Sequence, residues 1–322
     1  MIKKEKTFSM RILKLQALLR RLPVNHFSRK RIEEELAKCL AGHYGEKSIE
    51  YHLSEVNAKD YFLFHDLRMS LDQVHFFQID ILIMTKGFIL ILEVKNMKGI
   101  LLFDQHYHQL IRTYNGKEEI FADPILQVKR QQNSLKQLLQ KGNFSTIPIY
   151  SLVVIGSKAS GYKSIPAFSE TVKKNVIHAN LLKEKMDVLT LRNPNEILTK
   201  KEMNKVTRFL LKEDTPLNPD VMSQFQIPPS DIRTGVHCQS CFHLPMKRQR
   251  GTWKCGECGV SDKNAHVKSL EDYSLLLSGT ITNKECRAFL KIDSPSIASK
   301  LLGQLNLEHN SAVKYRKYQL TP

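Results

Sequence analysis

Hydrophobic residues recur with helical spacing in some segments of the chain and in strand-like runs in others. Together the two patterns predict a mixed α/β protein. The pattern predicts helices over residues 8–22, 29–41, 124–139 and 198–212. Apolar, strand-like runs cover residues 61–64, 76–84, 88–94, 99–103, 109–114 and 149–155. Strands that lead into a long helix and then into a further strand indicate a mixed sheet with crossover connections, flanked by helices.

The breaks between these elements divide the chain. Gly42 and Gly45 follow the second helix and are expected to end it near residue 41. Residues 214–231 hold four prolines, which argue against a packed core and predict a linker. We therefore expect a basic amphipathic helix in residues 1–28, an α/β domain in 29–213, the linker in 214–231, a cysteine-bearing segment in 232–262 and a small helical segment in 263–322.

Length and composition support a folded protein with more than one unit. The chain has 322 residues, above the roughly 250–300 at which a single hydrophobic core stops growing. Apolar residues make up 42% and charged residues 25%, a globular balance that excludes a disordered, collagenous or fibrous chain. Two or three packed units are expected.

The charge is uneven along the chain. In total, 49 Lys and Arg stand against 32 Asp and Glu, a formal net charge of +17. Residues 1–31 carry ten basic side chains and one acidic, and residues 228–322 carry fourteen and eight, so the middle is nearly neutral. The basic ends predict a polyanionic partner, either nucleic acid, with DNA favoured, or an anionic membrane surface.

The helix expected over residues 8–22 has three interpretations. Its apolar positions Ile12, Leu15, Leu19 and Leu22 alternate with the basic Arg11, Lys14 and Arg20. The helix could pack on the body with a solvated basic face, contact nucleic acid, or form a membrane-surface or protein contact. All three remain open at this point.

The sequence predicts a cytoplasmic protein without a transmembrane segment. No run approaches the roughly 18 apolar residues that a membrane-spanning helix needs. Basic residues interrupt the first apolar stretch, which therefore lacks the continuous core of a signal peptide. Four of the six cysteines form two Cys-x-x-Cys pairs, which suit a metal in a reducing compartment better than disulfides.

The paired cysteines predict a Zn²⁺ site. Cys238-x-x-Cys241 and Cys255-x-x-Cys258 are separated by thirteen residues, the spacing of two knuckles that close one tetrahedral four-cysteine site. The segment resembles a zinc ribbon. Basic and aromatic residues between the pairs are candidate nucleic-acid contacts, with a purely structural knuckle as the alternative: Lys247, Arg248, Arg250 and Trp253.

The C-terminal segment predicts short helices followed by a basic strand. Thr282-Asn283-Lys284-Glu285 is a capping box, and Ser294-Pro295 places Pro at the first position of another helix. Residues 312–320 have a strand-like pattern with several bases. This order resembles a helix-turn-helix with a wing, and a protein-docking bundle is the alternative. The candidate DNA contacts on the last helix are Ser296, Ser299 and Lys300.

Charged residues at the end of one buried strand are the candidate catalytic group. Glu93 and Lys95 alternate with Val94 along the strand, so their side chains project to the same side. Asp80 lies on the neighbouring strand of the expected hairpin. Two carboxylates and the Val94 carbonyl could hold Mg²⁺ or Mn²⁺, with Lys95 to orient a water and stabilise charge on a phosphate. A surface ion pair at a strand end is the alternative.

The order of motifs around these residues adds a family resemblance. Asp80, twelve residues and then Glu-x-Lys resembles the core of PD-(D/E)XK nucleases, although Ile79 stands where proline gives that motif its name. Three further motifs accompany it, Gly42-x-x-Gly45-Glu46, Asn96 with Gly99, and Pro124-x-x-Gln127. Together they resemble the nuclease-related domain (NERD) family over about residues 30–155.

The resemblance implies a PD-(D/E)XK nuclease-like mixed sheet and assigns roles within it. Asp80 and Glu93 would be metal ligands, Lys95 the catalytic lysine, Glu46 an acid from the first helical region, and Gln127 a polar residue near the active site. It implies a metal-dependent nuclease acting on DNA or RNA. The alternatives are a catalytically inactive nucleic-acid-binding or scaffold protein and a membrane-surface-associated protein.

Overall fold

The computed structural model describes residues 1–54, 61–144, 147–157, 159–310 and 316–320. The chain forms two compact units. The first unit consists of residues 1–7 and 40–217, and the second of residues 8–39 and 218–322. Helix α2 (Arg29–Lys47) contributes residues to both.

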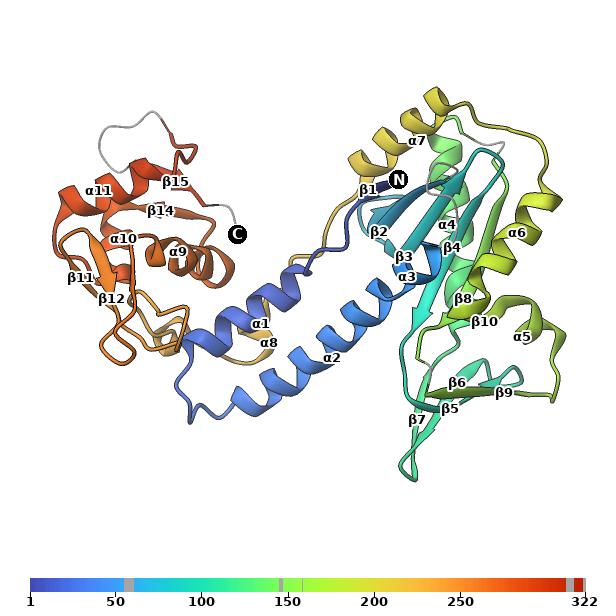
Figure 1. Cartoon of the computed structure of the whole chain (residues 1–322), viewed down its shortest axis with the longest axis horizontal. Coiled ribbons are helices and arrows are strands. Elements are labelled where there is room, and N and C mark those ends of the chain that lie inside the picture. Colours follow the sequence, from blue (N-terminus) through green and yellow to red (C-terminus); the bar gives the residue numbers. More distant parts are fainter. Residues whose placement is uncertain (55–60, 145–146, 158, 311–315, 321–322) are drawn as a thin grey trace. The chain divides into compact units, whose positions relative to one another are not determined.

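A six-stranded mixed sheet is the centre of the first unit (Figure 1). Its order is β1 (Ile2–Lys4), β2 (Tyr61–Ser70), β3 (Phe76–Thr85), β4 (Ile89–Lys95), β8 (Ile149–Ile155) and β10 (Val176–His178). Strands β2, β3 and β4 are antiparallel, whereas β1 joins β2 and β8 joins β4 and β10 in parallel. The mixed α/β fold class predicted from the sequence is confirmed.

The two faces of this sheet bury different side chains of each strand. In β4, Ile89 and Ile91 belong to one core together with α4 (Pro124–Lys141) and α7 (Lys200–Glu213). Leu90 and Leu92 belong to the other core together with α3 (Ile49–Leu53) and α6 (Leu182–Arg192). Because side chains alternate along a strand, the positions after Ile91 that face α4 are 93 and 95.

A smaller four-stranded sheet completes the first unit. Its order is β7 (Lys117–Ala122), β6 (Gln109–Tyr114), β5 (Gly99–Asp104) and β9 (Ser160–Ile165), and α5 (Glu170–Asn175) and the short helix η1 (Ala179–Leu181) follow. The turn predicted at Asn115-Gly116 joins β6 to β7, and both residues have positive φ, 51° and 73°.

The second unit combines segments from both ends of the chain. Its elements are α1 (Met10–Arg21), the first part of α2, α8 (Val221–Gln224), η2 (Pro229–Asp231), β11 (Lys247–Gln249), β12 (Thr252–Lys254), β13 (Ser261–Asp262), α9 (Ala265–Leu276), β14 (Thr280–Thr282), α10 (Asn283–Leu290), α11 (Pro295–Gln304) and β15 (Lys317–Gln319). One hydrophobic core contains residues of the N-terminal helix, the cysteine-bearing segment and the C-terminal helices. These three segments therefore do not fold around separate cores.

Two boundaries differ from the sequence predictions. Residues 214–231 were expected to be a linker, but within them the apolar side chains of Val221, Phe225 and Ile227 are buried in the core of the second unit. Helix α2 was expected to end near residue 41, but it continues through Gly42 and Gly45 to Lys47.

The apolar side of α1 is packed inside the protein. Leu15 and Leu18 are fully buried, in the core that α1 shares with α8 and α9. This packing gives no support to the membrane-surface alternative for residues 8–22. Across the described residues, no helix combines the length and apolar character that crossing a bilayer requires.

A buried ion pair fixes α1 to α9. Arg21 and Asp272 are both 0% exposed, and the Arg21 Nε donates to Asp272 Oδ2 at 2.8 Å. The neighbouring Arg20 donates to Asp272 Oδ1 at 2.6 Å. Arg21 also donates to the Gly235 carbonyl at 2.7 Å, so one guanidinium links the N-terminal helix, the segment before the first cysteine and α9.

Replacing Asp272 by Asn is expected to destabilise the protein by about 3–5 kcal/mol, because it leaves the buried Arg21 without its counter-charge. Thermal unfolding of the whole chain measures the loss. The matched control is Glu271→Gln, one residue away, whose pair with Lys268 is partly exposed and is expected to contribute less than about 1 kcal/mol. Equal effects of the two changes would contradict this account.

Candidate functional site

The candidate site lies where β3 separates from β4. The two strands pair only from Ile81 with Leu92 to Met84 with Ile89. Beyond that point the backbone N–H of Val94 donates to Asp80 Oδ2 at 2.9 Å. The carboxylate of Asp80 thus lies beside the end of β4, as the hairpin predicted from the sequence requires.

Glu93 is a buried carboxylate on the face covered by α4. Its side chain is 3% exposed and accepts from Lys95 Nζ at 2.7 Å and from Gln131 Nε2 at 2.8 Å. Lys95 Nζ also donates to Gln127 Oε1 at 3.3 Å. Asp123 caps α4 and Pro124 opens it, which places Gln127 in the first turn and Gln131 one turn later.

Gly45 allows α2 to approach the end of β4. A Cβ atom at this position would lie 2.3 Å from the Cβ of Asn96, closer than any real contact. Asn96 Nδ2 donates to the Ala41 carbonyl at 3.1 Å and holds the helix in this place. Only glycine fits here, and the next residue, Glu46, is thereby directed towards the carboxylates of β3 and β4.

Two further charged residues belong to the site. Lys6 Nζ lies 2.5 Å from Glu46 Oε2 and 2.7 Å from Asp66 Oδ2. Asp66 lies in β2 between the register pairs His65 with Ile81 and Leu67 with Ile79, so it is opposite Asp80. Its φ of 51° is unusual for a residue in a strand and coincides with the missing register pair between Asp66 and Asp80. The acidic site, as we name it, therefore contains Glu46, Asp66, Asp80, Glu93, Lys6, Lys95, Gln127 and Gln131.

Negative charge in the acidic site is incompletely balanced. Burial raises the pKa of Asp80 well above its usual range, and the charges of Glu93 and Glu46 raise it further. Burial also raises the pKa of Glu46 to about 7, although Lys6 opposes this shift. Burial lowers the pKa of His65 to about 4, so this neighbour is neutral at pH 7.

The donors of the acidic site are of the kind that divalent cations prefer, because Mg²⁺ and Mn²⁺ favour hard carboxylate oxygens. A bound cation would offset the carboxylate repulsion that adds to burial in raising the pKa values of Asp80 and Glu46. Among the described residues, the carboxylate oxygens of the acidic site do not come within 4.8 Å of one another in a group of three or more. Lysine ammonium groups pair with Glu46 and Glu93. Glu46, Asp80 and Glu93 are the side chains that would hold the ion.

The part of the first unit that contains most of the acidic site is similar to a known protein family. The model of the nuclease-related domain matches residues 41–156. Residues 41–156 form a nuclease-related domain. The match includes every acidic-site residue except Lys6. No curated protein and no solved structure matches the chain.

The structure brings together the five side chains that the sequence singled out in the nuclease-related domain, Glu46, Asp80, Glu93, Lys95 and Gln127. Sequence reasoning missed Lys6, Asp66 and Gln131. Gln131 could have been found, because it lies four residues after Gln127 on the same helix. Nothing local in the sequence connects Lys6 to a site that begins at residue 46. The Val94 carbonyl stays a predicted ligand.

A second candidate metal site lies outside the nuclease-related domain, in the second unit. The four sulfur atoms of Cys238, Cys241, Cys255 and Cys258 lie within 4.8 Å of one another. The Cys238–Cys258 and Cys241–Cys255 Sγ distances are 3.6 and 3.5 Å, close to those around a tetrahedral metal. Strands β11, β12 and β13 form an antiparallel sheet next to them. This cluster could hold zinc.

One predicted nucleic-acid contact near the cysteines was wrong. Trp253 is 1% exposed, and its Nε1 donates to His266 Nδ1 at 3.3 Å, so it is a core residue and no stacking surface. The small ribbon is covered by other parts of the second unit, which the sequence pattern did not reveal. Lys247 and Arg250 are exposed, and the Arg248 guanidinium lies over the Trp253 ring.

The C-terminal elements follow the predicted order. Helices α9, α10 and α11 occur with β14 between the first two, and β14 pairs in antiparallel with β15. Ser296, Ser299 and Lys300 are exposed on α11, and the Ser299 hydroxyl accepts from Asn283 Nδ2 at 2.8 Å. Residues 312–315 of the predicted basic strand lie outside the described residues.

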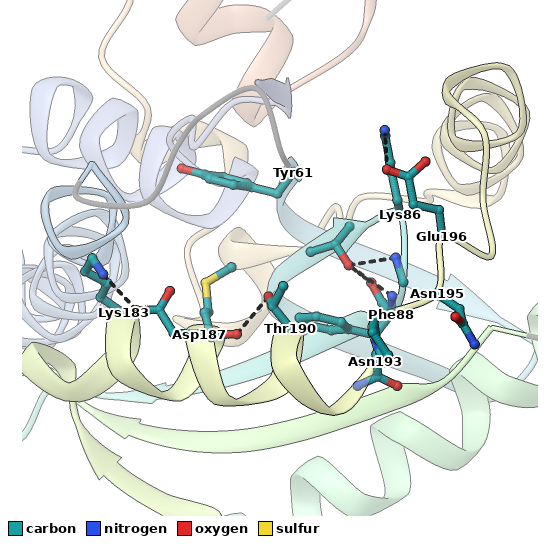
Figure 2. Close-up of a pocket in the computed structure, with 13 residues that line it drawn as sticks. Tyr61, Lys86, Phe88, Lys183, Asp187, Thr190, Asn193, Asn195 and Glu196 are labelled. Carbon is teal, nitrogen blue, oxygen red and sulfur yellow. Dashed lines mark hydrogen bonds and ion pairs between the residues drawn. The ribbon is translucent and has the colours of Figure 1, made fainter.

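A separate pocket of about 430 Å³ lies at the start of β4, the opposite end from Glu93 (Figure 2). Figure 2 shows Lys86 paired with Glu196 and Lys183 paired with Asp187. The nitrogen–oxygen distances of these two ion pairs are 2.6 and 2.7 Å. These opposite charges neutralise one another within the pocket wall. The pocket contributes no residue to the acidic site.

Gly45→Ala is expected to lower stability by about 1–3 kcal/mol, because the new methyl group would overlap Asn96. Thermal unfolding and metal binding by the acidic site measure the effect. The matched control is Gly42→Ala in the same helix, where the nearest atom to a new Cβ is 4.0 Å away. That change is expected to stabilise by roughly 0.4–1 kcal/mol. Equal changes in stability for Gly45→Ala and Gly42→Ala would show that the close approach of α2 to Asn96 is not the reason for glycine at position 45.

Cys255→Ser is expected to remove zinc from the protein, because a structural four-cysteine site needs all of its thiolates. Metal analysis of purified protein measures this as a fall from about one zinc per chain to none. Cys39→Ser is the control and is expected to retain zinc, since Cys39 lies outside the cluster. Zinc retained in Cys255→Ser would refute the assignment.

Proposed function

We propose that this protein is a metal-dependent nuclease-like phosphodiesterase that acts on DNA or RNA. The observation that carries the proposal is the convergence of Glu46, Asp80, Glu93 and Lys95 at the separation of β3 and β4. The nuclease-related domain supports it, because the whole of this group lies within the matched residues.

The chemistry proposed for the site follows from its charges. A bound Mg²⁺ or Mn²⁺ would supply Lewis acidity and a more acidic water for attack on phosphorus. Among the described residues, Glu93 and Gln127 accept two of the three donors of the Lys95 ammonium, which leaves one for a water or a phosphate oxygen. Gln131 holds the second oxygen of Glu93 and so fixes the orientation of that carboxylate.

The second unit is proposed to bind the nucleic acid. It carries most of the basic excess of the sequence, and counterion release from phosphates drives such binding. Helix α11 is the second helix of the helix-turn-helix-like pair α10 and α11. It presents Ser296, Ser299 and Lys300 to solvent. Lys247 and Arg250 extend the exposed basic surface to the ribbon. The cytoplasmic location stays a prediction from the sequence.

A second candidate is a nucleic-acid-binding protein without catalytic activity. The observation that favours it is the internal pairing of the carboxylates, since Glu93 already has Lys95 and Glu46 already has Lys6. In this case the acidic site would be a structural network of the first unit. The two functions differ in one measurable property, metal-dependent cleavage.

Wild-type protein with Mg²⁺ or Mn²⁺ is expected to cleave at least one substrate from a panel of single-stranded, duplex and branched DNA and RNA. Glu93→Gln and Lys95→Met are each expected to slow cleavage by about 10²-fold or more, because each removes charge from the reacting centre. Binding measured by fluorescence anisotropy should stay unchanged in both.

The control is Lys98→Met, which removes the same charge from an exposed position three residues beyond Lys95. It is expected to leave cleavage unchanged. Wild type as inert as both variants on every substrate would contradict the enzyme proposal and leave the binding function.

A further inference from the structure

We propose that Lys6 is a built-in cation of the acidic site, which takes the place of a second metal ion and limits the site to one divalent ion. This inference rests on the proposed metal-dependent function and specifies how many ions it uses. Lys6 lies outside residues 41–156, so the family match gives it no role.

The position of Lys6 is that of a bridging cation. Its ammonium lies 2.5 Å from a Glu46 oxygen and 2.7 Å from an Asp66 oxygen. The side chain is 5% exposed, so these two carboxylates must compensate the loss of its hydration. Glu46 comes from α2 and Asp66 from β2, and a point charge between two such oxygens bridges them and offsets their negative charge, as a metal ion would.

In a cation-bound site with all four carboxylates ionised, the formal charges match one divalent ion. Its four carboxylates, Glu46, Asp66, Asp80 and Glu93, stand against the two ammonium groups of Lys6 and Lys95. The remaining charge of −2 is that of one divalent cation. Without Lys6 the remainder would be −3, and a second ion could be accommodated between Glu46 and Asp66.

The N-terminal strand is already attached to the first unit by its pairing with β2 and by the contacts of Lys4, without Lys6. Strand β1 pairs with β2, and Lys4 Nζ donates to the Asp66 carbonyl and to Asp214 at 2.7 and 2.5 Å. Lys6 comes two residues after the end of β1 and reaches the acidic-site carboxylates instead. Lys4 is therefore a matched control with the same charge on the same segment.

The test counts Mn²⁺ ions bound to the zinc-loaded full chain, by calorimetric titration and by electron paramagnetic resonance. Wild type is expected to bind one Mn²⁺, which Glu93→Gln abolishes. Lys6→Met, or Lys6→Gln if the first variant folds poorly, is expected to bind two. Their spectrum should show the spin coupling of two ions about 4 Å apart.

Lys6→Arg should restore a count of one, and Lys4→Met should leave it at one. A single Mn²⁺ in Lys6→Met or Lys6→Gln would overturn the inference and leave the proposed function intact, since Lys6 would then be a structural tether or a competitor for one ion position. Two ions in wild type would also overturn it. No Mn²⁺ in wild type would overturn both proposals.

Discussion

Four carboxylates, of which Glu93 is buried and the other three are half-buried, meet at the separation of β3 and β4, and this is the constraint on which the first unit depends. Carboxylates in a low-dielectric environment repel one another and lose hydration, so cations and donors must surround them. The cations and donors of the acidic site come from distant parts of the chain: Lys6 precedes α1, Lys95 lies in β4 and Gln131 lies in α4. Gly45 serves the same end, because it lets α2 bring Glu46 into the group.

In the second unit, a buried ion pair constrains how the helices pack. Arg21 and Asp272 are fully buried, and Arg21 also reaches the backbone at Gly235. Such pairs contribute little net stability compared with apolar residues of similar volume, but a buried charge that loses its partner is strongly destabilising. The pair therefore favours the packing of α1 with α9 in one core.

Local patterns predicted Asp80, Glu93 and Lys95 in the acidic site, and the family resemblance added Glu46 and Gln127. Alternation in β4 placed Glu93 and Lys95 on one side, and Pro124 placed Gln127 in the first turn of its helix. Lys6 could not be found in this way, because it meets Glu46 across 40 residues without a local pattern. Trp253 was misassigned because a ribbon of about thirty residues has no core of its own, and the segments that cover it lie elsewhere in the sequence.

The division of the chain into units affects the order in which it can fold. The first seven residues belong to one unit, the next 32 to the other, and the chain then returns to the first before it completes the second. Arg21 emerges from the ribosome 251 residues before Asp272. At about 5–20 residues per second, α1 waits roughly 10–50 s for its counter-charge. During synthesis the first unit can close around Lys6 before α8 and α9 are made, so the apolar side of α1 is covered only after the first unit is complete.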